Sequence, residues 1–223
     1  MLTLTETEII NAIEKSQHCQ RNWDLSKTIP EDHINLFIEA VKRAPSKQNI
    51  AHYKTHFISD RNLITLIADC TRRHSNNVWL LNKMELTKTI NSQALANLLI
   101  VFEFYQDYSS PEIYNRNAEA KTVFLNSQLG GPKQIMEADG YTAIGIASGY
   151  VALLANMLGY STGFCGCIQS DNMSKVLNTD NKIMLLLGVG FPNDGVDHVV
   201  HHEISTHRYP ILSKQEILIN RIP

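Results

Sequence analysis

Residues 141–158, YTAIGIASGYVALLANML, form the longest strongly patterned segment of the chain and predict a mostly apolar helix. Small or short polar residues fall on one side of this helix: Gly145, Gly149, Ala152 and Asn156. Each glycine inside a helix costs roughly 0.5–1 kcal/mol relative to alanine, and close approach of another backbone offsets that cost. The pattern predicts either tight packing inside the monomer or a helix at the centre of a dimer. Gly159 is expected to end the helix.

Two further helix starts are expected on the N-terminal side. Thr5-Glu6-Thr7-Glu8 matches a capping box, in which the Thr and the Glu three residues later each bond the other's backbone amide. The apolar side of this first helix consists of Ile9, Ile10 and Ile13. Residues 28–31 predict a second start of the same kind, with Pro30 in the first turn. The inward face of the second helix consists of Ile34, Phe37, Ile38 and Val41, and Pro45 is expected to end it at Ala44.

The other patterned segments predict a sheet with short helices. Strands are expected over residues 53–59, 98–102 and 182–189. A short helix is expected over 62–70, and a third capping box at 213–216 predicts a C-terminal helix. Residues 105–135 are polar and aromatic, and both a lid-like excursion and a helical hairpin stay open for them.

The bulk composition predicts an ordinary globular protein. The 223 residues are 43% hydrophobic and 19% charged, so we expect one α+β domain over residues 1–223, with a sheet wrapped by helices. The net charge of −2 argues against a nucleic-acid partner. The absence of an apolar run of about 18 residues argues against a membrane span. The N-terminus does not resemble a signal peptide, so we expect a cytoplasmic location. The cysteines are then expected to be reduced: Cys19, Cys70, Cys165 and Cys167.

Histidines and cysteines near the C-terminal half invite a metal site. The histidines are His198, His201, His202 and His207, but no H-E-x-x-H motif is present. Cys165 and Cys167 are separated by one residue, too few for a structural zinc knuckle, so we expect them to be small packing residues. The glycine-rich segment 159–166 follows a helix rather than preceding one, which excludes a phosphate-binding P-loop. A metal-dependent enzyme therefore stays a minor alternative.

Arg21 and Arg208 are candidate phosphate ligands, because a guanidinium group offers a fork of donors to an anion. They lie near opposite ends of the chain. A shared site would require the fold to bring the two ends together.

Four stretches together resemble the nitroreductase family of FMN-dependent oxidoreductases. They are QHCQRNWDLSKTIPEDHI (17–34), RAPSKQNIAHYKTHFISD (43–60), GIASGYVALLANMLGYSTGFCG (145–166) and LLLGVGFP (185–192). The first is similar to the family's R-R/H-S-x-R/K-x-F motif and the second to A-P-S-x-x-N-x-Q-P-W. The third is similar to the central helix that runs into L-G-L-G, and the fourth to the I-x-L-G-Y-P strand.

The resemblance implies an α+β sandwich with a mixed or antiparallel sheet, an intertwined homodimer, and FMN at the dimer interface. It implies that FMN is bound by residues of four segments: Gln17, His18, Cys19 and Arg21; Pro45, Ser46, Lys47 and Asn49; Phe164, Cys165 and Gly166; and His207 and Arg208. The second group typically belongs to the partner subunit. The chain departs from the family motif at Gln17, where Arg is usual, and at Cys19, where Ser is usual. Phosphate binding would then rely on Arg21 and Arg208.

The resemblance also implies a ping-pong reaction. NADH or NADPH would act as a transient reductant, passing a hydride to the flavin at N5, and a small flat acceptor such as a nitroaromatic or a quinone would then be reduced. The cofactor carries such chemistry, so no catalytic side chain is expected. Two alternatives stay open: a relative that uses FMN for another redox reaction, and a flavin-binding protein without nicotinamide-dependent turnover.

Overall fold

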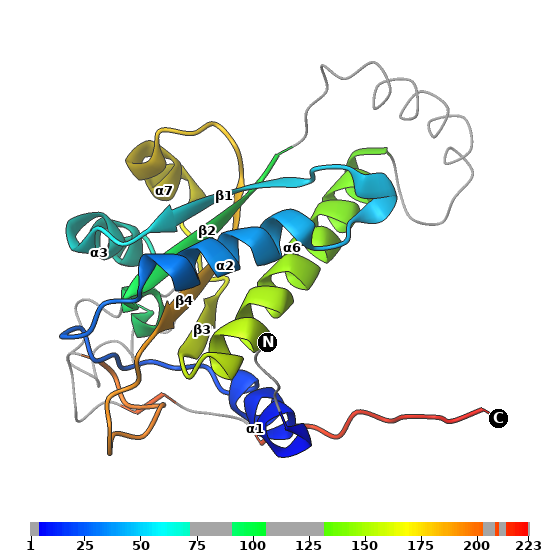
Figure 1. Cartoon of the computed structure of the whole chain (residues 1–223). Coiled ribbons are helices and arrows are strands. Elements are labelled where there is room, and N and C mark those ends of the chain that lie inside the picture. The colour runs from blue at the N-terminus through cyan, green and yellow to red at the C-terminus, as the bar shows by residue number, and fades with distance from the viewer. Residues whose placement is uncertain (1–4, 72–90, 106–131, 203–207, 210–212, 223) are drawn as a thin grey trace.

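The computed structural model describes residues 5–71, 91–105, 132–202, 208–209 and 213–222 (Figure 1). Its sheet has four antiparallel strands in the order β1-β2-β4-β3. The strands are β1 (Tyr53–Ile58), β2 (Leu98–Phe104), β3 (Ser161–Cys165) and β4 (Ile183–Gly190). The expected strands at 53–59, 98–102 and 182–189 are confirmed within a residue or two. β3 was not predicted.

Helices cover both faces of this sheet. On one face lie α2 (Glu31–Arg43) and α6 (Pro132–Met157), and on the other lie α3 (Arg61–Asp69) and α7 (Ser170–Leu177) (Figure 1). Residues of β2 alternate between the two cores: Leu98, Ile100 and Phe102 face α2 and α6, while Leu99 and Val101 face α3 and α7. This explains the fully apolar sequence of β2, since both of its faces are buried. The expected α+β class is confirmed.

The N-terminal helix α1 (Glu6–Ser16) begins as predicted. The Thr5 side chain accepts a bond from the Glu8 amide, and the Glu8 carboxylate accepts one from the Thr5 amide at 2.8 Å. Its expected apolar side, however, is not covered. Ile9, Ile10 and Ile13 are exposed, and Ala12 is the buried residue of the helix.

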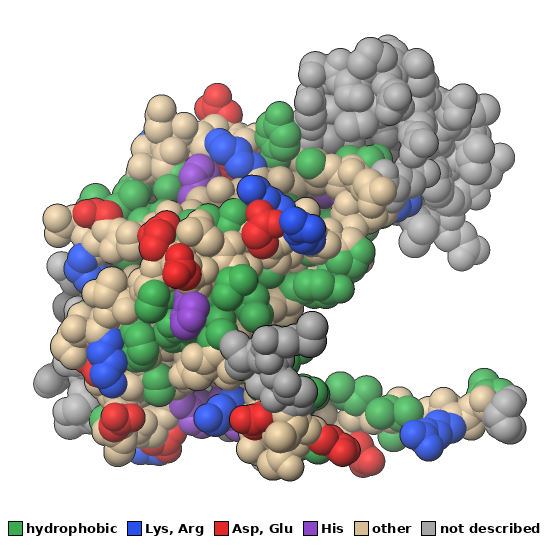
Figure 2. All heavy atoms as spheres, in the orientation of Figure 1, with side chains coloured by type: hydrophobic (Ala, Val, Ile, Leu, Met, Phe, Trp, Pro, Cys, Tyr) green, Lys and Arg blue, Asp and Glu red, His purple; other side chains and the backbone are tan. Residues whose placement is uncertain are grey.

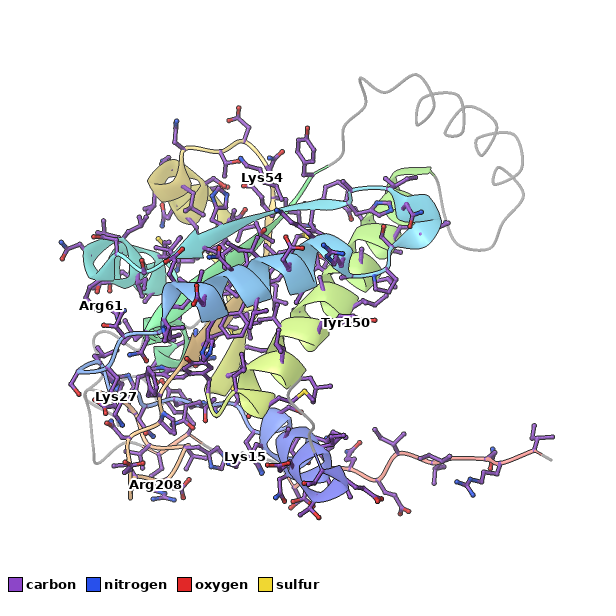
Figure 3. The ribbon with its side chains drawn as sticks, viewed as in Figure 1. Lys15, Lys27, Lys54, Arg61, Tyr150 and Arg208 are labelled. Atoms are coloured by element: carbon purple, nitrogen blue, oxygen red, sulfur yellow. The ribbon has the colours of Figure 1, made fainter. Side chains whose placement is uncertain are left out.

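Of the small residues predicted on one side of α6, Ala152 and Asn156 are buried within the single chain, but Gly145 and Gly149 are not explained by packing inside it. A Cβ atom added at Gly145 or Gly149 would meet nothing within 4 Å in the described part of the chain. On the same helix, Tyr141 and Tyr150 are half exposed, and Figure 3 shows Tyr150 projecting away from the ribbon. Hydrophobic side chains reach the surface along this helix (Figure 2). Tight packing within the monomer was therefore the wrong explanation for these glycines.

Three expectations about helix ends are corrected. The Thr28 capping box does not form, since Pro30 is itself the N-cap of α2 and no side chain caps it. No C-terminal helix starts at Ser213, because residues 213–222 are an exposed segment without helix or strand. α6 starts at Pro132, nine residues before the predicted helix. The ends of α2 at Ala44 and of α6 before Gly159, with φ of +88°, agree with prediction.

Most of the 105–135 segment lies outside the described residues, so the choice between a lid and a hairpin is untested. In the described part of the chain, no helix combines the length and apolar character that crossing a membrane requires.

Candidate functional site

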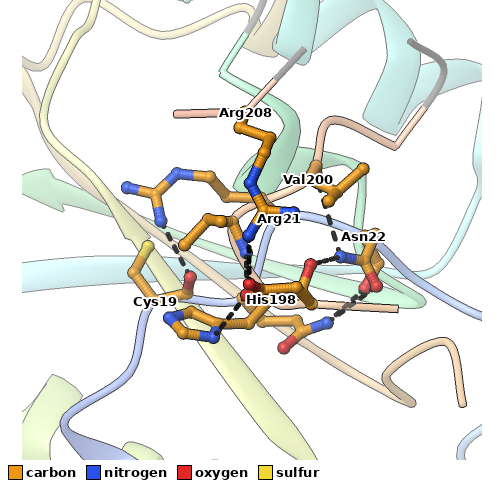
Figure 4. A network of polar contacts seen from close by, with 9 residues as sticks. Cys19, Arg21, Asn22, His198, Val200 and Arg208 are labelled. Carbon is orange, nitrogen blue, oxygen red and sulfur yellow. Dashed lines mark hydrogen bonds and ion pairs between the residues drawn. The ribbon is translucent and has the colours of Figure 1, made fainter. Parts of the chain in front are cut away.

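The fold brings the segment after α1 against the segment after β4. The Gln20 amide donates to the Thr162 carbonyl of β3 at 2.8 Å, and the Arg21 amide donates to the His198 carbonyl at 3.0 Å. Val200 and Arg208 form an isolated antiparallel bridge. Through these contacts Arg21 and Arg208 enter one cluster, as Figure 4 shows. The fold thus brings the two ends of the chain together, as a site shared by Arg21 and Arg208 requires.

Arg21 is held by several neighbours. Its guanidinium donates to the Cys19 carbonyl at 2.9 Å and lies over the ring of Tyr209, 4.9 Å from the centroid. Its Nε atom is buried and has no hydrogen-bond partner among the described residues. A buried N–H without a partner costs about 1–3 kcal/mol, so an anion that accepted from it would be favoured.

Two imidazoles lie beside the arginines. The rings of His18 and His198 are 4.9 Å apart, and His198 Nδ1 lies 3.2 Å from an Asp197 carboxylate oxygen. The same carboxylate pairs with Arg208. His18 was expected here from the motif. His198 and Asp197 were not, and His207 lies outside the described residues.

The electrostatic environment shifts three groups of this cluster. Burial lowers the pKa of His198, and His18, Arg21 and Arg208 lower it further, while Asp197 opposes them. The Val199 amide and Arg208 hold the pKa of Asp197 below its usual value. Burial raises the pKa of the Cys19 thiol. At neutral pH the cluster therefore contains two guanidinium groups and one carboxylate, with His198 mostly neutral.

The end of β3 lies next to this cluster. Cys19 Sγ is 3.6 Å from the Phe164 carbonyl oxygen. A Cβ atom at Gly163 would lie 2.6 Å from the Gln20 carbonyl oxygen, so only glycine allows this approach. By contrast, a Cβ atom at Gly166 would meet nothing within 4 Å in the described residues, which leaves its backbone open to a ligand. Cys165 is buried, and burial raises its pKa to about 12.

Gln93 is a site residue that the sequence did not reveal. Its side chain is 6% exposed, and Nε2 donates to the Phe164 carbonyl at 3.4 Å. Its Oε1 atom has no hydrogen-bond partner in the described part of the chain. A signal was present, since the polar pair Ser92-Gln93 lies a few residues before the apolar strand β2, in the short helix η2 (Ser92–Leu95).

Gln17 lies at the end of α1, and its role in FMN binding stays a prediction. It is the C-cap of α1, its amide bonds to the Lys15 carbonyl, and its side chain is exposed.

The predicted loop with Pro45, Ser46, Lys47 and Asn49 lies elsewhere. It follows the C-terminal end of α2, whereas Arg21 precedes its N-terminal end, and 13 helical residues span about 20 Å. Lys47 Nζ pairs with Asp139 of α6 at 2.8 Å. An open pocket of about 240 Å³ is lined by Pro45, Ser46, Lys47, Asp139, Thr142, Ala143 and Ile146. One chain therefore does not bring this loop to the arginine cluster (Figure 1).

The histidines considered above as metal ligands contact different residues in the structure. His202 Nδ1 accepts from the Trp23 amide at 3.1 Å, and the His201 ring stacks on Tyr209. Among the described residues, no three His, Cys, Asp or Glu side chains are grouped as a metal site.

Comparisons with known proteins bear on the family and the fold of this chain. Residues 15–191 match the model of the nitroreductase family. A nitroreductase with bound FMN from Bacteroides fragilis has a TM-score of 0.60 and 13% identity, covering 99% of this chain and 98% of that chain. A protein from Exiguobacterium sibiricum, solved in complex with FMN, has a TM-score of 0.58 and 18% identity, covering 96% and 95%.

A third solved structure has a similar fold. The NADPH:FMN oxidoreductase from Vibrio harveyi, complexed with NAD⁺, has a TM-score of 0.58 and 16% identity, covering 92% of this chain and 80% of that chain. Among curated protein sequences, none matches this chain. Because the family match spans residues 15–191 of 223, the chain belongs to the nitroreductase family.

Proposed function

We propose that this chain is an FMN-dependent oxidoreductase that uses NADH or NADPH to reduce a small flat acceptor. The observation that carries the proposal is the cluster of Arg21 and Arg208, which Cys19 links to the end of β3 through its contact with the Phe164 carbonyl. Two guanidinium groups next to a strand end suit a ligand with a phosphate at one end and an aromatic ring system at the other.

The residues present fit FMN. Arg21 Nε is a buried donor without a partner, which suits a phosphate oxygen or a ring carbonyl. Gln93 Oε1 is a buried acceptor without a partner, which suits an N–H on the edge of a pyrimidine ring. We assign Arg21, Arg208 and His18 to the phosphate and ribityl end. Cys19, Phe164, Cys165, Gly166 and Gln93 would lie along the ring.

When bound, FMN supplies two-electron chemistry between a nicotinamide and an oxidised acceptor. The protein contributes orientation and fixed charge. Because Arg21 is assigned to the phosphate end, Lys47, which pairs with Asp139 within its own chain, is the remaining candidate for the positive charge that stabilises a negatively charged ring. β3 orients the backbone N–H groups near Gly166. Contacts between these groups and the flavin ring involve no proton transfer by a side chain. The fold relative from Vibrio harveyi, named an NADPH:FMN oxidoreductase, supports a nicotinamide reductant.

We further propose that the site is completed by a second copy of the chain. The loop with Pro45, Ser46, Lys47 and Asn49 follows the C-terminal end of α2, a helix about 20 Å long, whereas the segment with Arg21 precedes its N-terminal end. A homodimer could bring the partner's loop to that cluster. The open glycine side of α6 and the uncovered isoleucines of α1 offer the surface for such a contact. Consistent with this, apolar residues of the C-terminal segment are 73–90% exposed in the single chain: Ile217, Leu218, Ile219 and Ile222.

The acceptor is proposed only as a class. A nitroaromatic or a quinone is flat and electron-poor, so it needs a stacking surface rather than specific hydrogen bonds. The cytoplasm, where reduced nicotinamides are available, is the proposed location.

The direct test of the site is cofactor binding. The purified chain should show a flavin absorbance spectrum, or acquire one after incubation with FMN and gel filtration, at about one FMN per chain. A protein that is colourless and also retains no added FMN would contradict the proposal.

A further inference from the structure

His198 occupies the centre of the cationic cluster although no motif assigns it a role. Its carbonyl accepts from the Arg21 amide at 3.0 Å, and its ring lies 4.9 Å from that of His18. Its Nδ1 is 3.2 Å from Asp197, whose carboxylate also pairs with Arg208 (Figure 4). Every charged group of the cluster thus lies near this imidazole.

The net charge of the cluster depends on the His198 imidazole. The groups that face His198 come from three segments: His18 and Arg21 after α1, Asp197 on its own loop, and Arg208 across the Val200 bridge. The two guanidinium groups and the carboxylate together contribute one net positive charge. Protonation of His198 adds one more.

Building on the proposed function, we propose that His198 is a titratable part of the phosphate-binding site, so that FMN binds more tightly as the pH falls from about 8 to about 6. Gln17, before the cluster in the sequence, is exposed and carries no charge. The His198 imidazole would add a positive charge to the cluster at low pH.

The direction of the pH effect on FMN affinity follows from the linkage between proton binding and FMN binding. Burial and the neighbouring cations lower the pKa of His198 in the single chain, so the imidazole is mostly neutral near pH 7. A bound phosphate dianion adds opposite charge and raises the imidazole pKa. A group whose pKa is higher in the complex favours binding below that pKa, and the gain is lost as the pH rises through it. FMN binding should therefore take up protons. Because the free phosphate protonates with a pKa of about 6, the gain should level off near that pH.

The experiment measures dissociation constants of FMN and riboflavin for the full chain between pH 5.5 and 8. Riboflavin has the same ring system without the phosphate. We expect FMN to bind about tenfold more tightly at pH 6 than at pH 8, since a charge-assisted bond to phosphate is gained. Riboflavin affinity should stay nearly constant. Calorimetry in two buffers of different ionisation enthalpy should show net proton uptake for FMN and none for riboflavin, and this readout needs no variant.

One variant and a control assign the effect to the residue. His198→Asn should flatten the pH dependence while FMN still binds. His56→Asn removes an imidazole on β1, outside the cluster, and should leave the dependence unchanged.

The outcomes separate this inference from the proposed function. FMN binding that is independent of pH, an unchanged pH dependence in His198→Asn, or the same dependence for riboflavin would overturn the role of His198 while leaving the flavin site intact. If neither flavin binds at any pH, the proposed function fails and this inference fails with it.

Discussion

Arg21 and Arg208 reach the same cluster with different degrees of preorganisation. Arg21 is fixed by its bond to the Cys19 carbonyl and by the Tyr209 ring, and it keeps a donor without a partner among the described residues. Arg208 has a side chain that is 59% exposed, and its ion pair is with Asp197. A preorganised guanidinium loses less conformational entropy on binding a ligand, so Arg21 should contribute more to anion affinity.

Replacement of each arginine tests this difference. Arg21→Ala should weaken FMN binding about a hundredfold, and Arg208→Ala about tenfold. Each variant loses charge-assisted bonds to the phosphate, and those of the preorganised Arg21 should be the stronger. Arg43→Ala, at the exposed end of α2 and paired with Glu39, is the matched control and should have no effect. Fluorescence titration of FMN measures all three. Wild-type affinity in both site variants would refute the phosphate roles.

Asp197 is the acidic residue of the cluster and competes with a phosphate. Its carboxylate pairs with Arg208 and with His198, the groups to which an anion would bind. Asp197→Asn keeps an oxygen that can accept from the Val199 amide but removes the negative charge. FMN affinity should therefore increase in this variant, most clearly at low salt, where charges are least screened. A decrease in affinity would show that Asp197 holds the site together instead of competing with the ligand.

At the scale of elements, the sequence predicted the helix ends and strands that depend on interactions between neighbouring residues. The Thr5 capping box, the stop at Pro45 and the apolar run of β2 all formed as expected, because each depends on neighbours within a few residues. β3 was missed because it has five residues and a glycine in the middle, and its stability comes from pairing with β4. The expected helix at Ser213 had a start signal but no surface of its own chain on which to bury its apolar residues.

The candidate site also contains some residues that the sequence predicted and others whose roles depend on long-range contacts. The motif positions of His18 and Arg21 could be identified from sequence, since both stand in the recognisable stretch 17–34, and Arg208 could be identified as a basic residue near the C-terminus. That Arg208 would meet Arg21 depends on contacts between residues almost two hundred positions apart, such as the bond from Asn22 Nδ2 to the Asp197 carbonyl at 2.7 Å. Gln93, His198 and Asp197 were missed because their roles arise from those long-range contacts.

At the scale of the whole molecule, the single chain separates the two halves of the proposed site. The loop around Ser46 and the cluster around Arg21 lie beyond opposite ends of α2. A Cβ atom at Gly149 of α6 meets nothing within 4 Å in the described residues, although glycine weakens a helix. Both observations have one explanation if α6 lies at a dimer interface. In the proposed dimer, FMN binding would depend on the second chain.

A leucine at Gly149 should test that dependence. Gly149→Leu places a large side chain where close approach of a second chain is proposed, so the 25.2 kDa chain should become monomeric and lose FMN together with the dimer. Its fold should persist, since the position is open in the single chain. Asn62→Leu adds the same side chain at an exposed position of α3 and should stay dimeric. Light scattering after gel filtration measures the mass. A dimeric Gly149→Leu variant with full FMN content would contradict the proposed interface.

The most direct measurement of the central claim is an anaerobic titration of the FMN-loaded protein with NADPH, and in parallel with NADH. The proposed oxidoreductase should lose its flavin absorbance near 450 nm in proportion to the nicotinamide added, as expected of a flavin that accepts two electrons from each nicotinamide. Addition of a quinone should then restore the absorbance. If the bound flavin stays oxidised with excess of both nicotinamides, yet is bleached by dithionite, the chain binds FMN without nicotinamide-dependent turnover, and the account is contradicted.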